Sequence, residues 1–184
     1  MRSAYSRKKQ PHAVRRAILD EAGRIAAEKG LAEVTIQSVA TGAGVTKGGV
    51  FHHFASKQAL MSAMFDDMLA RIDAEIDALM VDDRGYGRFS RAYVTALTVG
   101  KFGVGSPFDA MSLSVLADAG MSRDWLAWLE GRVERHADTD DDPMLEVVRF
   151  AADGAWLTYS GTSGPRTKLH ELADRLIAMT RKAG

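Results

Sequence analysis

Apolar side chains recur at intervals of three or four residues along most of the chain, which is the spacing that places them on one face of an α-helix. The longest stripe lies within residues 57–81 and consists of Leu60, Met64, Met68, Ile72, Ile76 and Leu79. No alternating run is long enough to indicate a β-sheet. The pattern predicts an all-α fold of about nine helices, over residues 11–30, 35–42, 46–54, 57–81, 86–101, 108–119, 122–136, 143–161 and 165–182.

Residues with strong positional preferences mark the ends of these predicted helices. Thr35, Thr46 and Ser56 each precede a helix, where a side-chain hydroxyl can accept a hydrogen bond from a free backbone N–H. Gly30 follows the first helix, at a position that favours a left-handed backbone. We expect residues 138–142, which are mostly acidic, to form a solvated loop, and the glycine-rich residues 100–107 to form another break between helices.

The composition is that of a soluble globular protein. Of 184 residues, 46% are hydrophobic and 26% are charged, and no stretch approaches the roughly 18 to 20 apolar residues of a membrane-spanning helix. Residues 1–12 are basic and lack the apolar segment of a secretory signal. The absence of cysteine excludes disulfides, thiolate metal sites and a cysteine nucleophile. A cytoplasmic location is therefore expected.

The net charge of zero conceals an uneven distribution. Residues 1–60 contain ten Lys and Arg against four Asp and Glu, whereas residues 61–184 contain fourteen against twenty. A basic first segment on an acidic remainder suits a protein that binds a polyanion such as DNA at one end. Chance clustering of solvated charges is the alternative.

The second and third predicted helices carry the pattern of a helix-turn-helix unit. Ala40 is small enough for two helices to cross closely, and four residues later Gly44 tolerates the positive φ of a sharp reversal. Val39, Val45 and Val50 supply apolar contacts on either side of the turn. Three short helices could also form a simple bundle, but these residue types at these offsets favour DNA binding, with the third helix in the major groove.

The third predicted helix contains two adjacent glycines, Gly48 and Gly49. At interior positions such a pair costs about 2 kcal/mol relative to alanine, and less in a first turn. Close approach of the backbone to DNA explains this cost, because glycine has no Cβ. A loose turn that needs glycine only for its geometry is the alternative.

Three segments, Thr35–Ala40, Ala43–Phe54 and Ser56–Leu60, resemble the N-terminal signature of TetR-family transcriptional regulators. The resemblance covers about a third of the chain, whereas the rest resembles the family only in length and helical pattern. It implies a DNA-binding surface that consists of Thr35, Gln37, Thr46, Lys47, Gly48, Gly49, Phe51, His52, His53 and Lys57.

Within that surface, the resemblance implies phosphate contacts at the helix N-termini by Thr35 and Thr46. It places Gln37 and Lys47 within reach of base edges. Their chemistry agrees, because a glutamine amide pairs with adenine and a lysine ammonium with guanine.

The remaining members of the surface have more general roles. The resemblance implies that His52 touches a base or sugar and that His53 and Lys57 contact the DNA backbone. Phe51 departs from the family pattern, which usually has tyrosine there, so the hydroxyl that would bond a phosphate is missing.

The domain organisation follows from these segments. We expect a basic flexible arm over residues 1–11, a DNA-binding domain over residues 12–56, and an effector-binding and dimerisation domain over residues 57–184. Basic residues that could enter the minor groove or follow phosphates are Arg2, Arg7, Lys8, Lys9, Arg15 and Arg16. A disordered solubilising tail is the alternative for the arm.

The resemblance further implies a homodimer that pairs through the last two helices. Their candidate interface residues are Leu145, Val148, Ala152, Ala155, Leu169, Leu172, Leu176 and Met179. These stripes could equally be buried within one subunit. Two-fold symmetry predicts a pseudo-palindromic operator in double-stranded DNA.

A small-molecule effector pocket is also implied, and the chain is expected to be a repressor that an apolar or aromatic ligand releases from its operator. The candidate pocket residues are Met64, Met68, Thr98, Phe102, Phe108, Met111, Trp125, Trp128, Trp156 and Tyr159. Side chains of this kind are also typical of an ordinary core.

The sequence offers little support for an enzyme. Residues 170–174 lack the second histidine of a zinc-protease helix, and no strand precedes the glycines of residues 100–105 as a nucleotide-binding loop requires. We expect no cofactor and no metal. The alternatives are a helical ligand-binding module without DNA binding and a cofactor-free enzyme that uses Asp109 or Tyr159.

Overall fold

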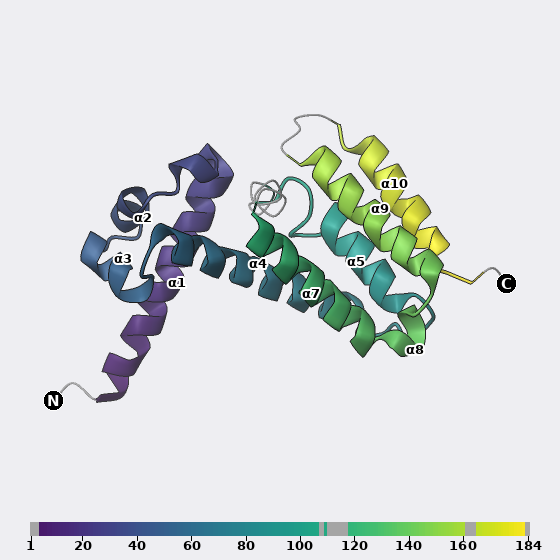
Figure 1. Ribbon diagram of the computed structural model, residues 1–184, viewed down its shortest axis with the longest axis horizontal. Helices are drawn as coiled ribbons and strands as arrows, with labels where there is room; N and C mark the ends of the chain where they lie inside the picture. The colour runs from purple at the N-terminus through teal and green to yellow at the C-terminus, as the bar shows by residue number, and fades with distance from the viewer. Residues whose placement is uncertain (1–3, 107–108, 110–117, 161–164, 183–184) are drawn as a thin grey trace. The chain divides into compact units, whose positions relative to one another are not determined.

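The computed structural model describes residues 4–106, 109, 118–160 and 165–182. The predicted all-α fold is confirmed, because none of these residues lies in a β-strand. Their helices (Figure 1) are α1 Ala4–Lys29, the short 3-10 helix η1 Leu31–Glu33, α2 Ile36–Gly42, α3 Lys47–His53, α4 Lys57–Leu79, α5 Arg88–Thr98, α7 Ala119–Arg135, α8 Ala137–Asp140, α9 Pro143–Tyr159 and α10 Thr167–Met179. The predicted helix over 108–119 falls almost wholly outside the described residues.

The chain divides into two compact units, a head over Met1–Asp67 and a body over Met68–Gly184. This division falls within α4, later than the boundary that the sequence predicts after Ser56. The first part of α4 belongs with the head because Arg16 of α1 forms an ion pair with Asp67. Leu60 and Phe65 of α4 are also buried.

The head is built around α1, which is longer than predicted. The predicted arm is helical from Ala4, and Pro11 lies inside the helix. Alanine, arginine, lysine and glutamine, which make up most of residues 4–10, are strong helix formers, and this offsets the backbone hydrogen bond that a proline removes. The predicted end is confirmed, because α1 stops at Lys29 and Gly30 has a φ of +88°.

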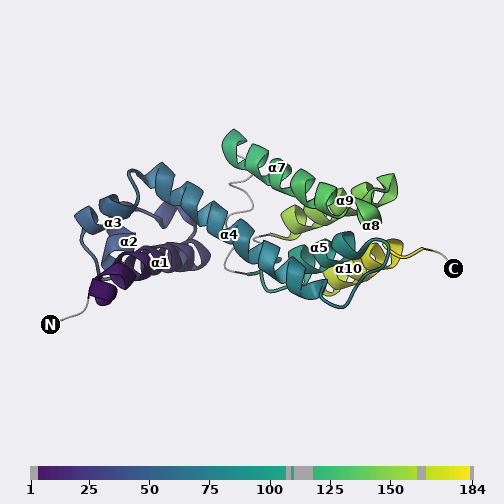
Figure 2. The ribbon, with the colours of Figure 1, turned by 90° about the horizontal axis from the view of Figure 1, so that it is seen from below.

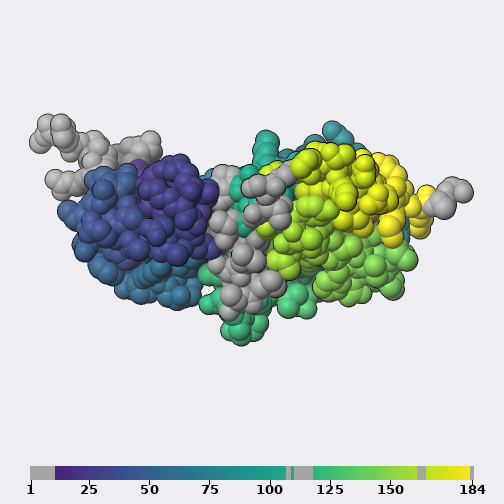
Figure 3. All heavy atoms as spheres, turned by 90° about the horizontal axis from the view of Figure 1, so that it is seen from above, coloured from purple at the N-terminus to yellow at the C-terminus, as the bar shows by residue number. Residues whose placement is uncertain are grey.

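The body packs α5 against both α9 and α10, and α9 and α10 also contact each other (Figure 2). In the space-filling view, these last two helices form one continuous side of the body (Figure 3). α5 supplies the centre of the core, where Phe89, Tyr93 and Val94 are fully buried. No helix of the described residues has the length and apolarity needed to cross a membrane.

The long stripe along α4 is buried as predicted, with one exception. Leu60, Met64, Met68, Ile72 and Ile76 are buried, whereas Leu79 at the end of the helix is 44% exposed. The helix therefore buries one face along most of its length, as its spacing requires.

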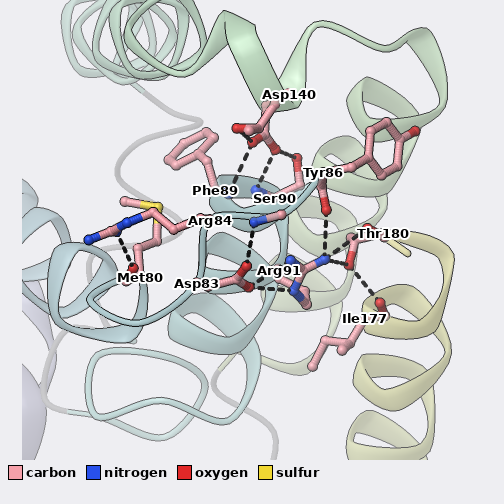
Figure 4. Close-up of polar contacts among 12 residues, drawn as sticks. Met80, Asp83, Arg84, Tyr86, Phe89, Ser90, Arg91, Asp140, Ile177 and Thr180 are labelled. Atoms are coloured by element: carbon pink, nitrogen blue, oxygen red, sulfur yellow. Dashed lines mark hydrogen bonds and ion pairs between the residues drawn. The ribbon is translucent and has the colours of Figure 1, made fainter. Parts of the chain in front are cut away.

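The acidic residues 138–142 differ from the predicted solvated loop. Residues 137–140 form the short helix α8, and the Asp140 side chain is fully buried. Its carboxylate accepts hydrogen bonds from Phe89 N at 3.1 Å, and from Ser90 N and Ser90 Oγ at 2.8 and 2.7 Å (Figure 4). Phe89 and Ser90 lie in the first turn of α5, whose free N–H groups need an acceptor. Asp140 is therefore the cap that the glycine preceding α5 cannot provide.

Candidate nucleic-acid interface

The reversal between α2 and α3 depends on Gly44, whose φ is +67°. Val45 N donates to Ala40 O at 3.0 Å, and Gly44 N donates to Thr41 O at 3.3 Å. A Cβ at Gly44 would meet no atom within 4 Å. Glycine is therefore required for its backbone conformation and not for space, and the predicted positive φ is confirmed.

α3 is anchored through a single fully buried side chain, Val50. Val39 and Ala40 of α2 are also buried, and Val45 is half-buried. The other residues of α3 are exposed or half-buried, so the helix presents most of its surface outward. This is the arrangement of the second helix of a helix-turn-helix unit.

The predicted contact residues lie on the outer surface of α2 and α3 and at the start of α4. None of them is fully buried, and Gly49 and His53 are half-buried. The exposed members are Thr35, Gln37, Thr46, Lys47, Gly48, Phe51, His52 and Lys57.

The caps of α2 and α3 are formed as the sequence predicts. Thr35 Oγ1 accepts a hydrogen bond from Ser38 N, and Thr46 Oγ1 accepts one from Gly49 N, each at 3.0 Å. Both bonds fix the backbone at the start of a helix, and the bond to Thr46 leaves the hydroxyl hydrogen of that residue for donation. Gln37 Nε2 donates to Thr41 Oγ1 at 3.1 Å, which holds the amide along α2.

Two histidines end α3, and their environments differ. His52 is exposed, whereas His53 is half-buried and packs at an angle of 77° against the His52 ring, with centroids 5.2 Å apart. Burial, and then the neighbouring His52 and Arg15, lower the pKa of His53. A neutral His53 near pH 7 can offer a phosphate a hydrogen bond but no charge. Among the described residues, no three His, Asp or Glu side chains converge on a possible metal site.

Two of the basic residues that the sequence predicts to contact DNA, Arg15 and Arg16, lie on α1. Arg15 lies over the Phe54 ring, 5.1 Å from its centroid. Arg16 binds Asp67 Oδ2 at 2.9 Å and Asp20 Oδ1 at 2.5 Å. These carboxylates make Arg16 a residue that ties α1 to α4, and its contact with DNA stays a prediction.

In the body, the three tryptophans form a packed aromatic cluster with Tyr93. Trp125 stacks on Trp156 with centroids 5.5 Å apart, and Trp128 lies 5.2 Å from Trp125 and 6.2 Å from Tyr93. Trp125 and Trp156 are buried and Trp128 is half-buried. The sequence predicted the tryptophans as pocket residues, but it did not indicate Tyr93, because a single tyrosine in an apolar helix is typical of a core.

The other predicted pocket residues have separate surroundings. Thr98 is buried and its hydroxyl donates to Val94 O at 2.6 Å, so Thr98 is a core residue whose hydroxyl hydrogen is already used. Met64 and Met68 are buried along α4, and Phe102 and Tyr159 are half-buried. Phe108 and Met111 lie outside the described residues.

A polar pair that the sequence did not indicate, the buried Tyr93 and the half-buried Asp153, lies beside the aromatic cluster. The Tyr93 hydroxyl donates to Asp153 Oδ1. Burial raises the pKa of Asp153 to about 6, against the lowering effects of Tyr93 and Arg149. Arg149 is itself buried, and its NH1 donates to Ser90 Oγ at 2.8 Å. The body therefore holds an aspartate that changes charge close to neutral pH.

Asp153 should make the stability of the body depend on pH. Because its pKa is raised from an ordinary value near 4 to about 6, its stabilising contribution is complete below pH 4 and is lost as the pH rises through 6. The stability difference between wild type and Asp153→Asn should therefore be about 1 kcal/mol more favourable to wild type at pH 5 than at pH 7.5. Urea unfolding followed by tryptophan fluorescence measures it, and parallel pH profiles would contradict the assignment.

Buried charge also joins α7 to the body portion of α4. Arg132 is 1% exposed and pairs with Asp73 at 3.0 Å and Asp77 at 2.6 Å. Trp128 Nε1 also donates to Asp73 at 3.0 Å. Movement of α7 would therefore change the surroundings of α4.

Comparison with known families accounts for both units. Residues 18–64 match the family described as bacterial regulatory proteins, tetR family. Residues 87–181, more than half of the chain, match the family described as tetracyclin repressor-like, C-terminal domain. The chain belongs to the TetR family.

Relatives among characterised proteins match this chain over short segments. The repressor KstR2 of Mycobacterium tuberculosis is 36% identical over 52 residues, which cover 28% of this chain and 26% of that protein. The TetC protein of transposon Tn10 from Escherichia coli is 45% identical over 49 residues, 27% of this chain and 25% of the relative. These alignments span about a quarter of each relative's length.

Solved structures of other proteins resemble the chain along most of its length. A regulator described as SCO7518 from Streptomyces coelicolor A3(2) superposes with a TM-score of 0.70 at 16% identity, over 92% of this chain and 99% of that one. The multidrug binding protein EbrR, solved with ethidium, gives a TM-score of 0.64 at 25% identity over 90% of this chain and 97% of EbrR.

Most of the residues that the sequence predicts at the dimer interface are buried inside one chain, so their assignment to the interface is corrected. Those buried within a single chain are Leu145, Val148, Ala152, Ala155, Leu169 and Leu176. They pack within the body, where α5, α9 and α10 meet, so they cannot also meet a partner. Leu172 is half-buried and Met179 is 46% exposed.

Proposed function

We propose that this chain is a sequence-specific DNA-binding transcriptional regulator and not an enzyme. The observation that carries the proposal is the outward face of α3, which a glycine turn positions and a single valine anchors. In this proposal residues 12–56 recognise DNA, residues 57–184 bind an effector and a second copy, and the protein acts in the cytoplasm. Repression is the proposed mode, since KstR2 is a repressor.

The contact surface assigns different tasks to its residues. Lys47, at the start of α3, and Gln37, on α2, read base edges, because both are exposed and have hydrogen-bonding groups of the right reach. Lys57 at the start of α4 binds a backbone phosphate. Thr35 and Thr46 place helix N-termini against phosphates, and His52 touches a base or sugar.

A homodimer is the proposed assembly, and the structure suggests a different face of α9 from the one first predicted. Met144 and Val147 are exposed, Ala151 is half-buried, and a Cβ at Gly154 would meet nothing within 4 Å. Their spacing places them on one stripe with small residues that permit close helix packing. A two-fold dimer would recognise half-sites about 34 to 36 Å apart.

The proposed effector is a small apolar or aromatic molecule that binds beside the aromatic cluster. Trp156 Nε1 is buried without a hydrogen-bond partner among the described residues, so it offers a donor to a ligand. EbrR, which binds ethidium, shows that a similarly folded protein takes an aromatic ligand. Binding would act on DNA affinity through α7 and α4, provided that the ligand prefers one conformation of the body.

The decisive experiment is selection of bound fragments from random or genomic DNA, followed by titration of the recovered site. A regulator should recover a pseudo-palindrome, and its affinity should fall about 10³-fold or more between 50 and 200 mM salt. Purified protein that binds no DNA at low salt would refute the proposal.

A helical ligand-binding module without DNA binding is the second candidate. One observation favours it: Phe51 is 50% exposed on α3 and has no hydroxyl for a phosphate. Recovery of an operator in the selection would exclude this reading.

Substitution of the two lysines should separate base recognition from phosphate binding. Lys47→Ala should weaken binding to the selected operator about tenfold and relax preference at one base position, because a base contact is lost. Lys57→Ala should weaken binding to every sequence alike and reduce the salt dependence. Fluorescence anisotropy on the operator and on scrambled DNA measures both effects, and an equal loss on all DNA for Lys47→Ala would contradict its role.

A further inference from the structure

A groove of about 550 Å³ lies on the outer side of the body, between α7 and α9, with α8 and the turn that follows it also contributing to its lining. Its volume is within the range of about 300–1,000 Å³ that is typical of sites for small organic ligands. None of the pocket residues predicted from the sequence lines it. The groove is therefore separate from the aromatic cluster.

The floor of this groove is apolar. Leu126, Leu129 and Val133 of α7 face it from one side, and Phe150 of α9 faces it from the other. Leu126 and Phe150 are 47% and 55% exposed. A planar or bulky apolar molecule placed here would remove this surface from water, which is favourable.

The rim of the groove is strongly acidic. Glu130 and Glu134 come from α7, Glu146 from α9, and Asp141 and Asp142 from the turn between α8 and α9. None of the three glutamates has a recorded hydrogen bond or ion pair with another side chain in the described parts of the chain. Glu146 acts electrostatically on the buried Arg149, and the charges of Glu130 and Glu134 are left for a ligand.

The one cation in the described lining is Arg149, and it is already engaged. Its NH1 donates to Ser90 Oγ at 2.8 Å and lies 3.4 Å from the Asp140 carbonyl oxygen. Asp140, another residue of the lining, offsets the charge of Arg149 through its buried carboxylate. The remaining carboxylates at the rim give the groove a net negative charge.

We propose that this groove binds a lipophilic organic cation. The apolar floor buries the hydrocarbon part of the ligand, the Phe150 ring faces its positive charge, and the carboxylates balance that charge across the rim. An anion of the same shape would meet repulsion from the same carboxylates. An effect of this binding on DNA affinity rests on the proposed function. Binding of the cation itself does not, because the groove requires no DNA.

Two ions of nearly identical shape and opposite charge provide the test. Isothermal titration calorimetry on the full chain, without DNA, should detect binding of tetraphenylphosphonium, whereas tetraphenylborate should bind at least tenfold more weakly. The triple variant Glu130→Gln, Glu134→Gln, Glu146→Gln should bind tetraphenylphosphonium about tenfold more weakly, because exposed charge pairs contribute little individually and add up over three positions. The matched control removes three exposed charges elsewhere, Asp66→Asn, Glu171→Gln and Asp174→Asn, and should leave binding unchanged.

Several results would overturn the proposal. They are a failure of tetraphenylphosphonium to bind, equal binding of both ions, and an equal loss of binding in the control variant. Light scattering adds another: if the Glu→Gln variant changes oligomeric state and the cation does not bind, the groove is covered by a second copy. Because the assay contains no DNA, these failures leave the proposed DNA binding intact, and loss of DNA binding would not affect them.

Discussion

Replacing Asp140 by alanine is expected to lower the free energy of unfolding of the body by about 3–5 kcal/mol, the usual cost of removing one partner from a buried charged network. The carboxylate accepts bonds from Phe89 N, Ser90 N, Ser90 Oγ and Thr139 Oγ1. In Asp140→Ala these donors lose a buried acceptor, and Arg149 loses a nearby opposite charge. Both losses act in the folded state only.

Urea unfolding followed by tryptophan fluorescence measures this effect, because Trp125, Trp128 and Trp156 all lie in the body. Asp138→Ala is the matched control, since Asp138 belongs to the same short helix but is exposed. A midpoint for Asp140→Ala close to that of Asp138→Ala would mean that the carboxylate does not cap α5 in solution.

Replacing Gly48 by alanine should stabilise the head and still weaken DNA binding about thirtyfold. A Cβ at Gly48 would meet only Thr46 Oγ1, at 3.8 Å, so the folded head accommodates it, and alanine gains up to about 1 kcal/mol over glycine in a helix. If the backbone of α3 approaches DNA closely, the same Cβ would meet the DNA. Overpacking of this kind costs about 1–3 kcal/mol.

Gly131→Ala provides the control for this experiment. Gly131 is exposed on α7, and a Cβ there would meet no atom within 4 Å, so alanine should stabilise the body and leave DNA affinity unchanged. Thermal unfolding and operator titration of both variants measure the two effects. Unchanged affinity for Gly48→Ala would show that glycine at this position serves the turn alone.

The head could be predicted closely because its elements depend on short-range rules. A hydroxyl before a helix and a glycine four residues after a buried alanine act through neighbours in the sequence. Thr35, Thr46 and Ser56 therefore form the expected caps, and Gly44 has the expected φ. The start of α1 was misjudged because a proline was read as a boundary.

The body was predicted less well because its helices have more than one apolar face. On α9, Leu145 and Val148 are buried, while Met144 and Val147, each one residue away, are exposed. Periodicity identifies both stripes but not the neighbour that covers each. Most of the predicted interface residues are therefore buried within one chain, whereas an interface that includes Leu172 and Met179 stays a prediction.

The roles of buried polar residues were the hardest to predict from the sequence. Nothing in the composition of residues 138–142 distinguishes Asp140 from the aspartates beside it, and Tyr93 and Asp153 are 60 positions apart. Their partners become apparent only when α5, α8 and α9 are brought together.

Because Asp140 caps α5, the protein should not tolerate changes in the length of the segment that precedes Asp140. Residues 137–142 have the composition of a surface connection, where insertions and deletions ordinarily accumulate. Here, removal of a single residue between His136 and Asp140 would turn the carboxylate by about 100° around its helix, away from α5. Homologues with this architecture should therefore differ in which acidic residues surround the capping aspartate. The number of residues between the end of α7 and the capping aspartate should stay the same.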